Sequence, residues 1–204
     1  MKVFYCVLSI ILITACTQTT ATRGASFIDP GWNGAPARSV IVDASHAPLG
    51  ERTAIENNAA ESLAKLGVNA LPAHSLFLPT RQYGLKERQD ILKNSGYETV
   101  LTVTPLDKKI EAHYTPPEPR PYGTIGYGSR GWGSGVGIGI GMNGGLYREE
   151  PIVTYNAELK IIAQDKVIWT GDFSTRGASG MNFAQVGKRF GNYIADKLRT
   201  DGLI

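Results

Sequence analysis

The stretch SVIVDASHAPLGERTAIENNAAESLAKLGVNAL, residues 39–71, contains a strand, a helix and a second strand in succession. Residues 39–44 form a short apolar run that predicts a buried strand. Residues 51–66 predict a helix, Gly67 stands where a left-handed helix cap belongs, and residues 68–71 give the second strand. The helix prediction rests on an apolar stripe at helical spacing, formed by Ile55, Ala59, Leu63 and Leu66.

The alternation of strands and helices continues beyond this stretch. Residues 85–94 predict a second helix that Gly96 ends, and the β-branched run at residues 99–104 predicts a third strand. A strand–helix–strand–helix–strand order favours parallel pairing through right-handed crossovers.

The second half of the chain changes to the two-residue period of an antiparallel pair. Residues 152–162 place apolar residues on one face, and Gln164 with Asp165 gives a tight turn. The return strand continues the apolar face with Val167, Trp169 and Phe173. We therefore expect a hairpin with one face toward solvent.

A final helix is predicted to begin after Asn182, which together with Gln185 resembles a capping box. Its apolar stripe consists of Phe183, Val186, Phe190, Tyr193, Ile194 and Leu198. The chain therefore predicts one α/β domain, with an α+β tendency, over residues 39–204. Its mixed sheet has the order β-α-β-α-β-β-β-α, with a Gly/Pro-rich loop at residues 115–148 between the third and fourth strands.

The N-terminus predicts an export signal with a lipidation site. Lys2 precedes eleven apolar residues, too few to span a bilayer, and residues 13–16 (Ile-Thr-Ala-Cys) match a bacterial lipobox. The resemblance to lipoproteins implies that residues 1–15 are cleaved and that Cys16 receives diacylglycerol and an amide-linked acyl chain such as palmitate. Two or more chains hold a protein stably on a membrane. Residues 16–38 lack apolar periodicity and predict a flexible tether.

Composition limits the partners. Removing Lys2 lowers the count of basic side chains from 21 to 20, against 18 acidic ones, and this near-neutral balance predicts no nucleic-acid partner. Cys6 leaves with the signal and Cys16 is lipidated, so no disulfide is expected. Lipoprotein sorting implies the outer membrane, because no Asp follows Cys16, with the domain facing the periplasm.

The order of elements resembles the α/β domain of the curli secretion channel lipoprotein and of the amino-terminal domain of the periplasmic Tol system protein. Two turns carry the likeness: residues 63–68 (LAKLGV), from helix to strand, and residues 94–101 (NSGYETVL), into the third strand. The late strand at residues 167–171 and the closing helix add to it. These are packing motifs, so the resemblance implies a fold and no activity.

Glycine is concentrated in one segment. Residues 122–145 hold 11 of the 24 glycines, and every second residue from 131 to 141 is Gly. Three hypotheses follow. The segment is a mobile loop, because glycine disfavours strand formation, or it is an interaction loop. The third hypothesis is a membrane-inserting hairpin, which would need several copies to close a barrel. The candidate interaction residues are Tyr122, Tyr127, Trp132, Ile138, Ile140, Met142 and Tyr147.

No set of residues predicts catalysis, a metal or a cofactor. His46 and His74 follow neighbouring predicted strands, with Asp43 nearby, but local metal-ligand spacing such as HxxxH is absent. We therefore expect a non-enzymatic, membrane-anchored lipoprotein that acts as a binding or envelope-assembly module, with an envelope protein or a second copy as partner. The alternative is a homo-oligomeric secretion or pore component that uses residues 122–146 as a hairpin.

Overall fold

The computed structural model describes residues 21–115, 119–125, 136–142 and 146–204. Six strands form one mixed sheet in the order β1-β8-β7-β4-β2-β3, and β5 pairs with β6 separately. The strands are β1 (Ala21–Ile28), β2 (Ser39–Asp43), β3 (Asn69–Pro72), β4 (Thr99–Thr115), β5 (Pro119–Ile125), β6 (Val136–Met142), β7 (Leu146–Ile161) and β8 (Lys166–Arg176). The helices are α1 (Leu49–Lys65), α2 (Leu85–Asn94), α3 (Phe183–Thr200) and the short 3₁₀ helix η1 (Ala73–Ser75).

The predicted α/β class and the mixed sheet are confirmed. Strand β2 pairs in parallel with both β3 and β4, as the strand–helix–strand–helix–strand order predicts. Strands β4, β7 and β8 then pair antiparallel. The sheet therefore joins a parallel half to an antiparallel half at β4.

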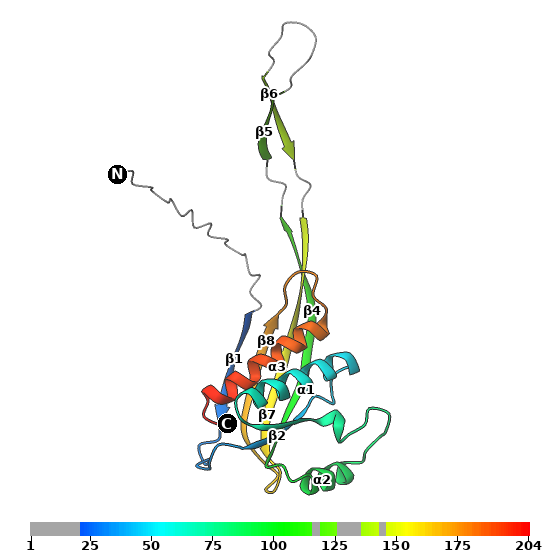
Figure 1. Cartoon of the computed structure of the whole chain (residues 1–204), viewed down its shortest axis with the longest axis vertical. Helices are drawn as coiled ribbons and strands as arrows, with labels where there is room; N and C mark the ends of the chain where they lie inside the picture. The colour runs from blue at the N-terminus through cyan, green and yellow to red at the C-terminus, as the bar shows by residue number, and fades with distance from the viewer. Residues whose placement is uncertain (1–20, 116–118, 126–135, 143–145) are drawn as a thin grey trace, which may run out of the picture.

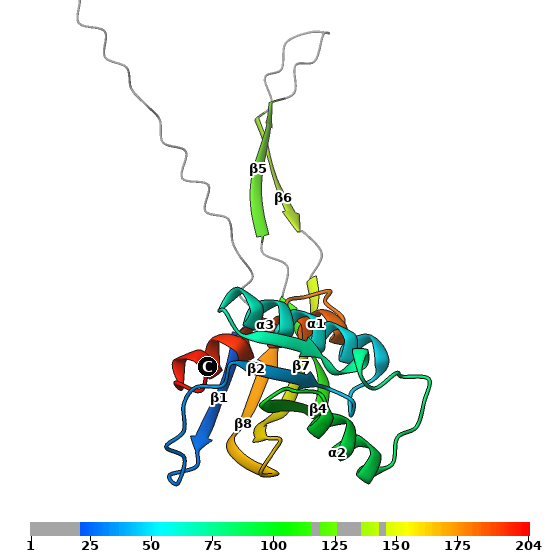
Figure 2. The same cartoon turned by 60° about the horizontal axis from the view of Figure 1, so that its bottom comes forward.

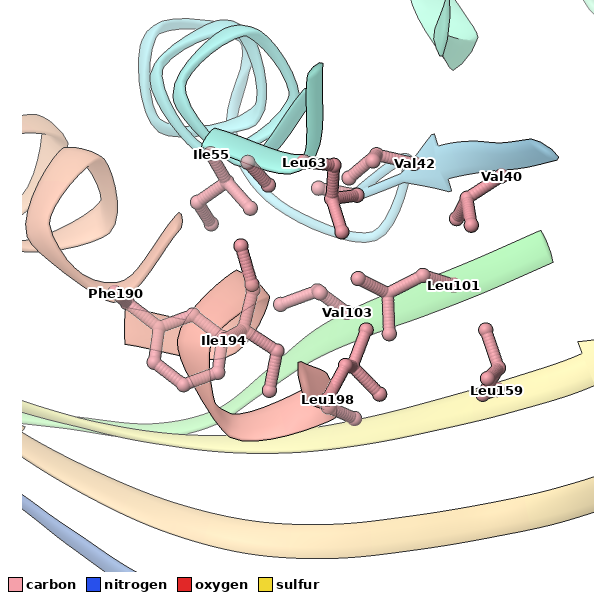
Figure 3. Packing of buried hydrophobic residues seen from close by; sticks show 14 of the residues in the cluster. Val40, Val42, Ile55, Leu63, Leu101, Val103, Leu159, Phe190, Ile194 and Leu198 are labelled. Carbon is pink, nitrogen blue, oxygen red and sulfur yellow. The ribbon is translucent and has the colours of Figure 1, made fainter. Parts of the chain in front are cut away.

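Helices α1 and α3 lie side by side on one face of the sheet (Figures 1 and 2). Figure 3 shows side chains from α1, α3, β2 and β4 pointing toward one another in the main core, among them Ile55, Val42, Leu101 and Phe190. The chain backbones of the two helices approach closely at Gly191, where an added Cβ would lie 2.8 Å from the Ile55 carbonyl oxygen.

A smaller core lies on the other face of the sheet. It contains Ile41, Phe77 and Val100, and Ile91 and Leu92 of α2 pack against it. The sheet is therefore covered on both faces around β2, which explains why residues 39–43 are buried without alternation.

Local signals in the sequence are confirmed at the helix ends. Gly67 and Gly96 adopt φ values of +86° and +77°, and Asn182 and Gln185 form the reciprocal capping box. Both glycines allow the left-handed turn that returns the chain to the sheet.

The expectation of a flexible tether over residues 16–38 is wrong at residues 21–28, which form the edge strand β1 on β8. The sequence shows no apolar alternation here because the side of β1 that faces α3 carries small residues. At Gly24 an added Cβ would lie 2.5 Å from the Phe173 ring, so only glycine lets β1 lie against this ring.

Two further expectations need correction. The predicted loop at residues 115–148 contains the antiparallel strands β5 and β6. Val167 is exposed, whereas Ile168 and Trp169 are both buried, because the register shifts between Leu159 and Lys160. This bulge interrupts the strict alternation of β8.

Candidate functional site

The most prominent feature of the molecule is a two-stranded extension, which we call the arm. It comprises residues 109–115 of β4 and 146–152 of β7, paired from Lys109–Ile152 to Thr115–Leu146. Strand β8 ends at Arg176, the register partner of Ile152. Beyond that point no second strand among the described residues pairs with β7, and only the loop after β8 bonds to it, through the amides of Gly177 and Gly180. Figure 1 shows the arm leaving the sheet, with β5 and β6 beyond it.

One face of the arm carries exposed apolar residues. Tyr114 and Tyr147 are register partners whose ring centroids lie 4.9 Å apart, and they are 53% and 76% exposed. Ile110, four residues along the same strand from Tyr114, is 58% exposed. Because aromatic side chains in such positions are suited to contact with a partner, this face is a candidate binding surface.

Charges occupy the opposite face. Glu111 and Glu150 are register partners, so their two carboxylates lie close together and repel each other. Arg176 donates to both, at 2.9 Å and 3.1 Å. A hydrogen bond from Lys109, supported by Arg176, holds the pKa of Glu111 below its ordinary value. The base of the arm is thus fixed to the end of β8.

The root of the arm is also fixed to helix α1. Glu51, buried at the start of α1, accepts hydrogen bonds from the Tyr155 hydroxyl at 3.0 Å and from the Lys108 ammonium group. Burial and the neighbouring Glu51 carboxylate raise the pKa of Tyr155, so this hydroxyl stays protonated and donates. The arm therefore leaves the domain in a defined direction.

Strands β5 and β6 pair antiparallel from Pro119–Met142 to Ile125–Val136, without a register shift. Val136, Ile138 and Ile140 stand opposite Ile125, Gly123 and Pro121, whereas the intervening Gly137, Gly139 and Gly141 stand opposite Thr124, Tyr122 and Arg120.

The N-terminal strand is attached to the domain by Asp201. This carboxylate accepts hydrogen bonds from Ser26 at 2.7 Å, Trp169 at 2.8 Å and Lys197 at 2.6 Å. Burial alone would raise the pKa of Asp201, but these hydrogen bonds outweigh it and lower the pKa below its ordinary value. Strand β1 begins at Ala21, the register partner of Arg176, so the chain enters the sheet beside the base of the arm.

The predicted interaction residues fall in different places. Tyr147 lies on the arm, and Tyr122, Ile138, Ile140 and Met142 lie in β5 and β6. Tyr127, Trp132 and Cys16 lie outside the described residues. Sequence reasoning left out Ile110 and did not pair Tyr114 with Tyr147, although the alternation of residues 110–114 could have indicated that Ile110 and Tyr114 share a face.

The histidines do not form a site with Asp43. His74 Nδ1 lies 2.7 Å from Glu56, whose fully buried carboxylate also accepts from Arg52, and Asp43 accepts from Arg88. His46 is exposed. Within the described residues no three His, Cys, Asp or Glu side chains are grouped so as to hold a metal. The charged groups at this edge of the sheet therefore pair with one another.

Among the described residues, no helix is long and apolar enough to cross a membrane.

The comparisons with known proteins yield distant likenesses. No family model and no curated protein matches the chain. Among solved structures it is similar to the PelC dodecamer from Paraburkholderia phytofirmans, with 14% identity, 87% of this chain and 97% of that chain covered, and a TM-score of 0.48. It is also similar to lipoprotein GNA1162 from Neisseria meningitidis, with 15% identity, 81% and 99% covered, and a TM-score of 0.43. These likenesses assign neither a family nor an activity.

Proposed function

We propose that this protein is a non-enzymatic, lipid-anchored envelope module whose arm faces the membrane that holds its N-terminus. The observation that carries the proposal is the register that places Ala21 opposite Arg176, and Arg176 opposite Ile152. The lipid-bearing end of the chain and the arm thus leave the same end of the sheet.

Chain lengths support a contact between the arm and the membrane. Cys16 precedes Ala21 by five residues, which span at most about 18 Å when fully extended. The arm extends from Lys109 to Thr115, about 20 Å at strand spacing, and β5 and β6 follow it. An anchor shorter than the arm brings the arm to the lipid surface or to a protein embedded in it.

The proposal includes acylation of Cys16, an outer-membrane location and a domain in the periplasm. Intact mass measurement of the mature protein tests the first of these. We expect a chain that begins at Cys16 and carries the mass of a diacylglyceryl group and an acyl chain. An unmodified Cys16 would contradict the anchor.

Lipid quenching tests the direction of the arm. The full-length acylated protein is placed in phosphatidylethanolamine–phosphatidylglycerol vesicles that contain nitroxide-labelled lipid. A fluorophore on Thr124→Cys in β5 should be quenched several-fold more than one on Asp165→Cys, in the turn between β7 and β8 at the opposite end of the sheet. Equal quenching at the two positions would contradict the proposal.

A second candidate function is a homo-oligomeric secretion or pore component. The observation that favours it is the β5–β6 register, in which apolar residues alternate with glycines along β6. Light scattering of the full-length protein in mild detergent separates the two functions. A defined ring that is lost when residues 116–145 are replaced by Asn-Gly favours a pore, and a monomer or dimer contradicts it.

A further inference from the structure

A hollow of about 590 Å³ lies at the end of the sheet opposite the arm. The connection between β1 and β2, residues 29–38, forms one wall, and the ends of β4, β7 and β8 form the other. This volume is within the range typical of small-molecule sites. The residues on which the argument rests are Trp32, Asn33, Arg38, Glu98, Gln164 and Lys166.

The wall formed by residues 29–38 is held in place by hydrogen bonds within the loop and by bonds to Lys166 and Glu98. Asp29 accepts from the Gly31 amide at 2.8 Å and pairs with Lys166 at 2.6 Å, and its carbonyl accepts from the Trp32 amide. At the other end, the Arg38 amide donates to Glu98 at 2.8 Å. Because this wall is fixed at both ends, the hollow is preformed, and less entropy is lost when a ligand binds.

Gly34 fixes the position of the Trp32 ring. A Cβ at Gly34 would lie 2.1 Å from the indole, so the ring packs directly against the backbone of the loop. The indole lines the hollow in this position and is partly buried against the main core. A rigid aromatic surface of this kind suits the apolar face of a ring-shaped ligand.

Three polar side chains of the hollow lack a protein partner. The amides of Asn33 and Gln164 and the guanidinium of Arg38 make no hydrogen bond or ion pair within the part of the chain that the structure describes. Lys166, by contrast, is neutralised by Asp29. Amides both donate to and accept from hydroxyl groups, and a free guanidinium binds a carboxylate in a bidentate manner.

We propose that this hollow binds an acidic saccharide, with a sugar ring on Trp32, hydroxyl groups on Asn33 and Gln164, and a carboxylate on Arg38. A peptide that binds by strand addition fits less well, because it needs a free strand edge. The strands at the hollow offer no such edge, since β4, β7 and β8 each pair on both sides. The site goes beyond the proposed function and does not depend on it.

Calorimetric titration of the full-length protein in mild detergent tests the proposal, with trigalacturonate as the acidic probe and maltotriose as the neutral one. We expect trigalacturonate to bind and maltotriose to bind at least about tenfold more weakly. Arg38→Gln should weaken trigalacturonate binding by about tenfold or more, because the charge-assisted pair is lost. Asn33 lies at an exposed loop position, and Asn33→Ala should weaken the binding of both probes.

The matched control is Arg23→Gln, which removes the same charge from the exposed strand β1, outside the hollow. It should leave binding unchanged. The proposal is overturned if neither probe binds, if the two probes bind equally, or if Arg23→Gln weakens binding as much as Arg38→Gln. Circular dichroism of each variant verifies the fold. None of these outcomes changes the position of the arm or the anchor.

Discussion

At the scale of single residues, two buried carboxylates and one partly buried carboxylate determine how the peripheral strands and helices attach to the sheet. Glu51 joins the root of the arm to α1, Glu56 joins α1 to η1, and Asp201 joins β1 to α3. Each carboxylate accepts hydrogen bonds from at least two donors, and losing such a partner costs more than an exposed ion pair contributes. These positions are therefore sensitive to conservative substitution.

Asp201→Asn should loosen β1. The amide retains the shape of the side chain but loses the charge that favours the bonds from Ser26, Trp169 and Lys197, at an expected cost of about 1–2 kcal/mol. Hydrogen exchange should accelerate in β1 first. Unchanged exchange in β1 would show that its backbone pairing with β8 is sufficient.

The same carboxylate predicts a dependence on pH. Because the pKa of Asp201 is lowered in the folded state, its stabilisation is present above the ordinary aspartate pKa, about 4, and is lost as pH falls through the lower folded value. Thermal unfolding between pH 6 and pH 2 should therefore show a smaller acid-induced loss of stability in Asp201→Asn than in the original protein. Parallel curves would contradict this assignment.

Tyr155→Phe should weaken the root of the arm. It removes one of the two donors to the buried Glu51 carboxylate, at an expected cost of about 1–3 kcal/mol in urea unfolding. Tyr97→Phe is the matched control, because its hydroxyl makes only an exposed, 3.5 Å contact with Asn69. Equal effects of the two substitutions would show that the bond to Glu51 contributes little.

At the scale of elements, the contact between α1 and α3 depends on small residues. Gly191→Ala places a Cβ 2.8 Å from the Ile55 carbonyl oxygen and 3.0 Å from the Ala59 nitrogen, so the helices must separate. We expect a loss of about 1–3 kcal/mol in urea unfolding. Gly50→Ala in α1, where nothing lies within 4 Å, should have no destabilising effect. A neutral Gly191→Ala would mean that the helix pair tolerates a wider spacing.

The elements predictable from sequence are those whose signal is local. The stripe of α3 and its capping box, the left-handed glycines after α1 and α2, and the apolar alternation of β7 all depend on neighbours in the chain. Strand β1 is not predictable in this way because its partners, residues 169–176, are remote in sequence and small residues such as Gly24 and Ser26 occupy the side that faces the core. The hollow was missed for the same reason, since residues 31–38 meet Glu98 and Gln164 only in three dimensions.

At the scale of the whole molecule, the two ends of the sheet carry different features. Strand β1 begins beside the arm at one end of the sheet (Figure 1). The hollow lined by residues 31–38 lies at the other end, where β4 begins and β7 ends. A protein anchored through Cys16 would therefore turn the arm toward its membrane and the hollow toward the aqueous compartment. The sheet sets this arrangement of the two ends, because all of β1, from Ala21 to Ile28, pairs with β8 and so places Ala21 beside the arm.

The α/β domain should fold without the segment beyond the arm. Replacing residues 116–145 by Asn-Gly joins Thr115 to its register partner Leu146 through a turn suited to a two-residue hairpin. The buried core residues that the structure describes lie within residues 37–103 and 152–203, so the midpoint of thermal unfolding should shift by no more than a few degrees. Circular dichroism and calorimetry measure this shift. A large loss of stability would show that β5 and β6 support the domain. If the domain is unchanged but no longer approaches lipid, the replaced segment makes the membrane contact.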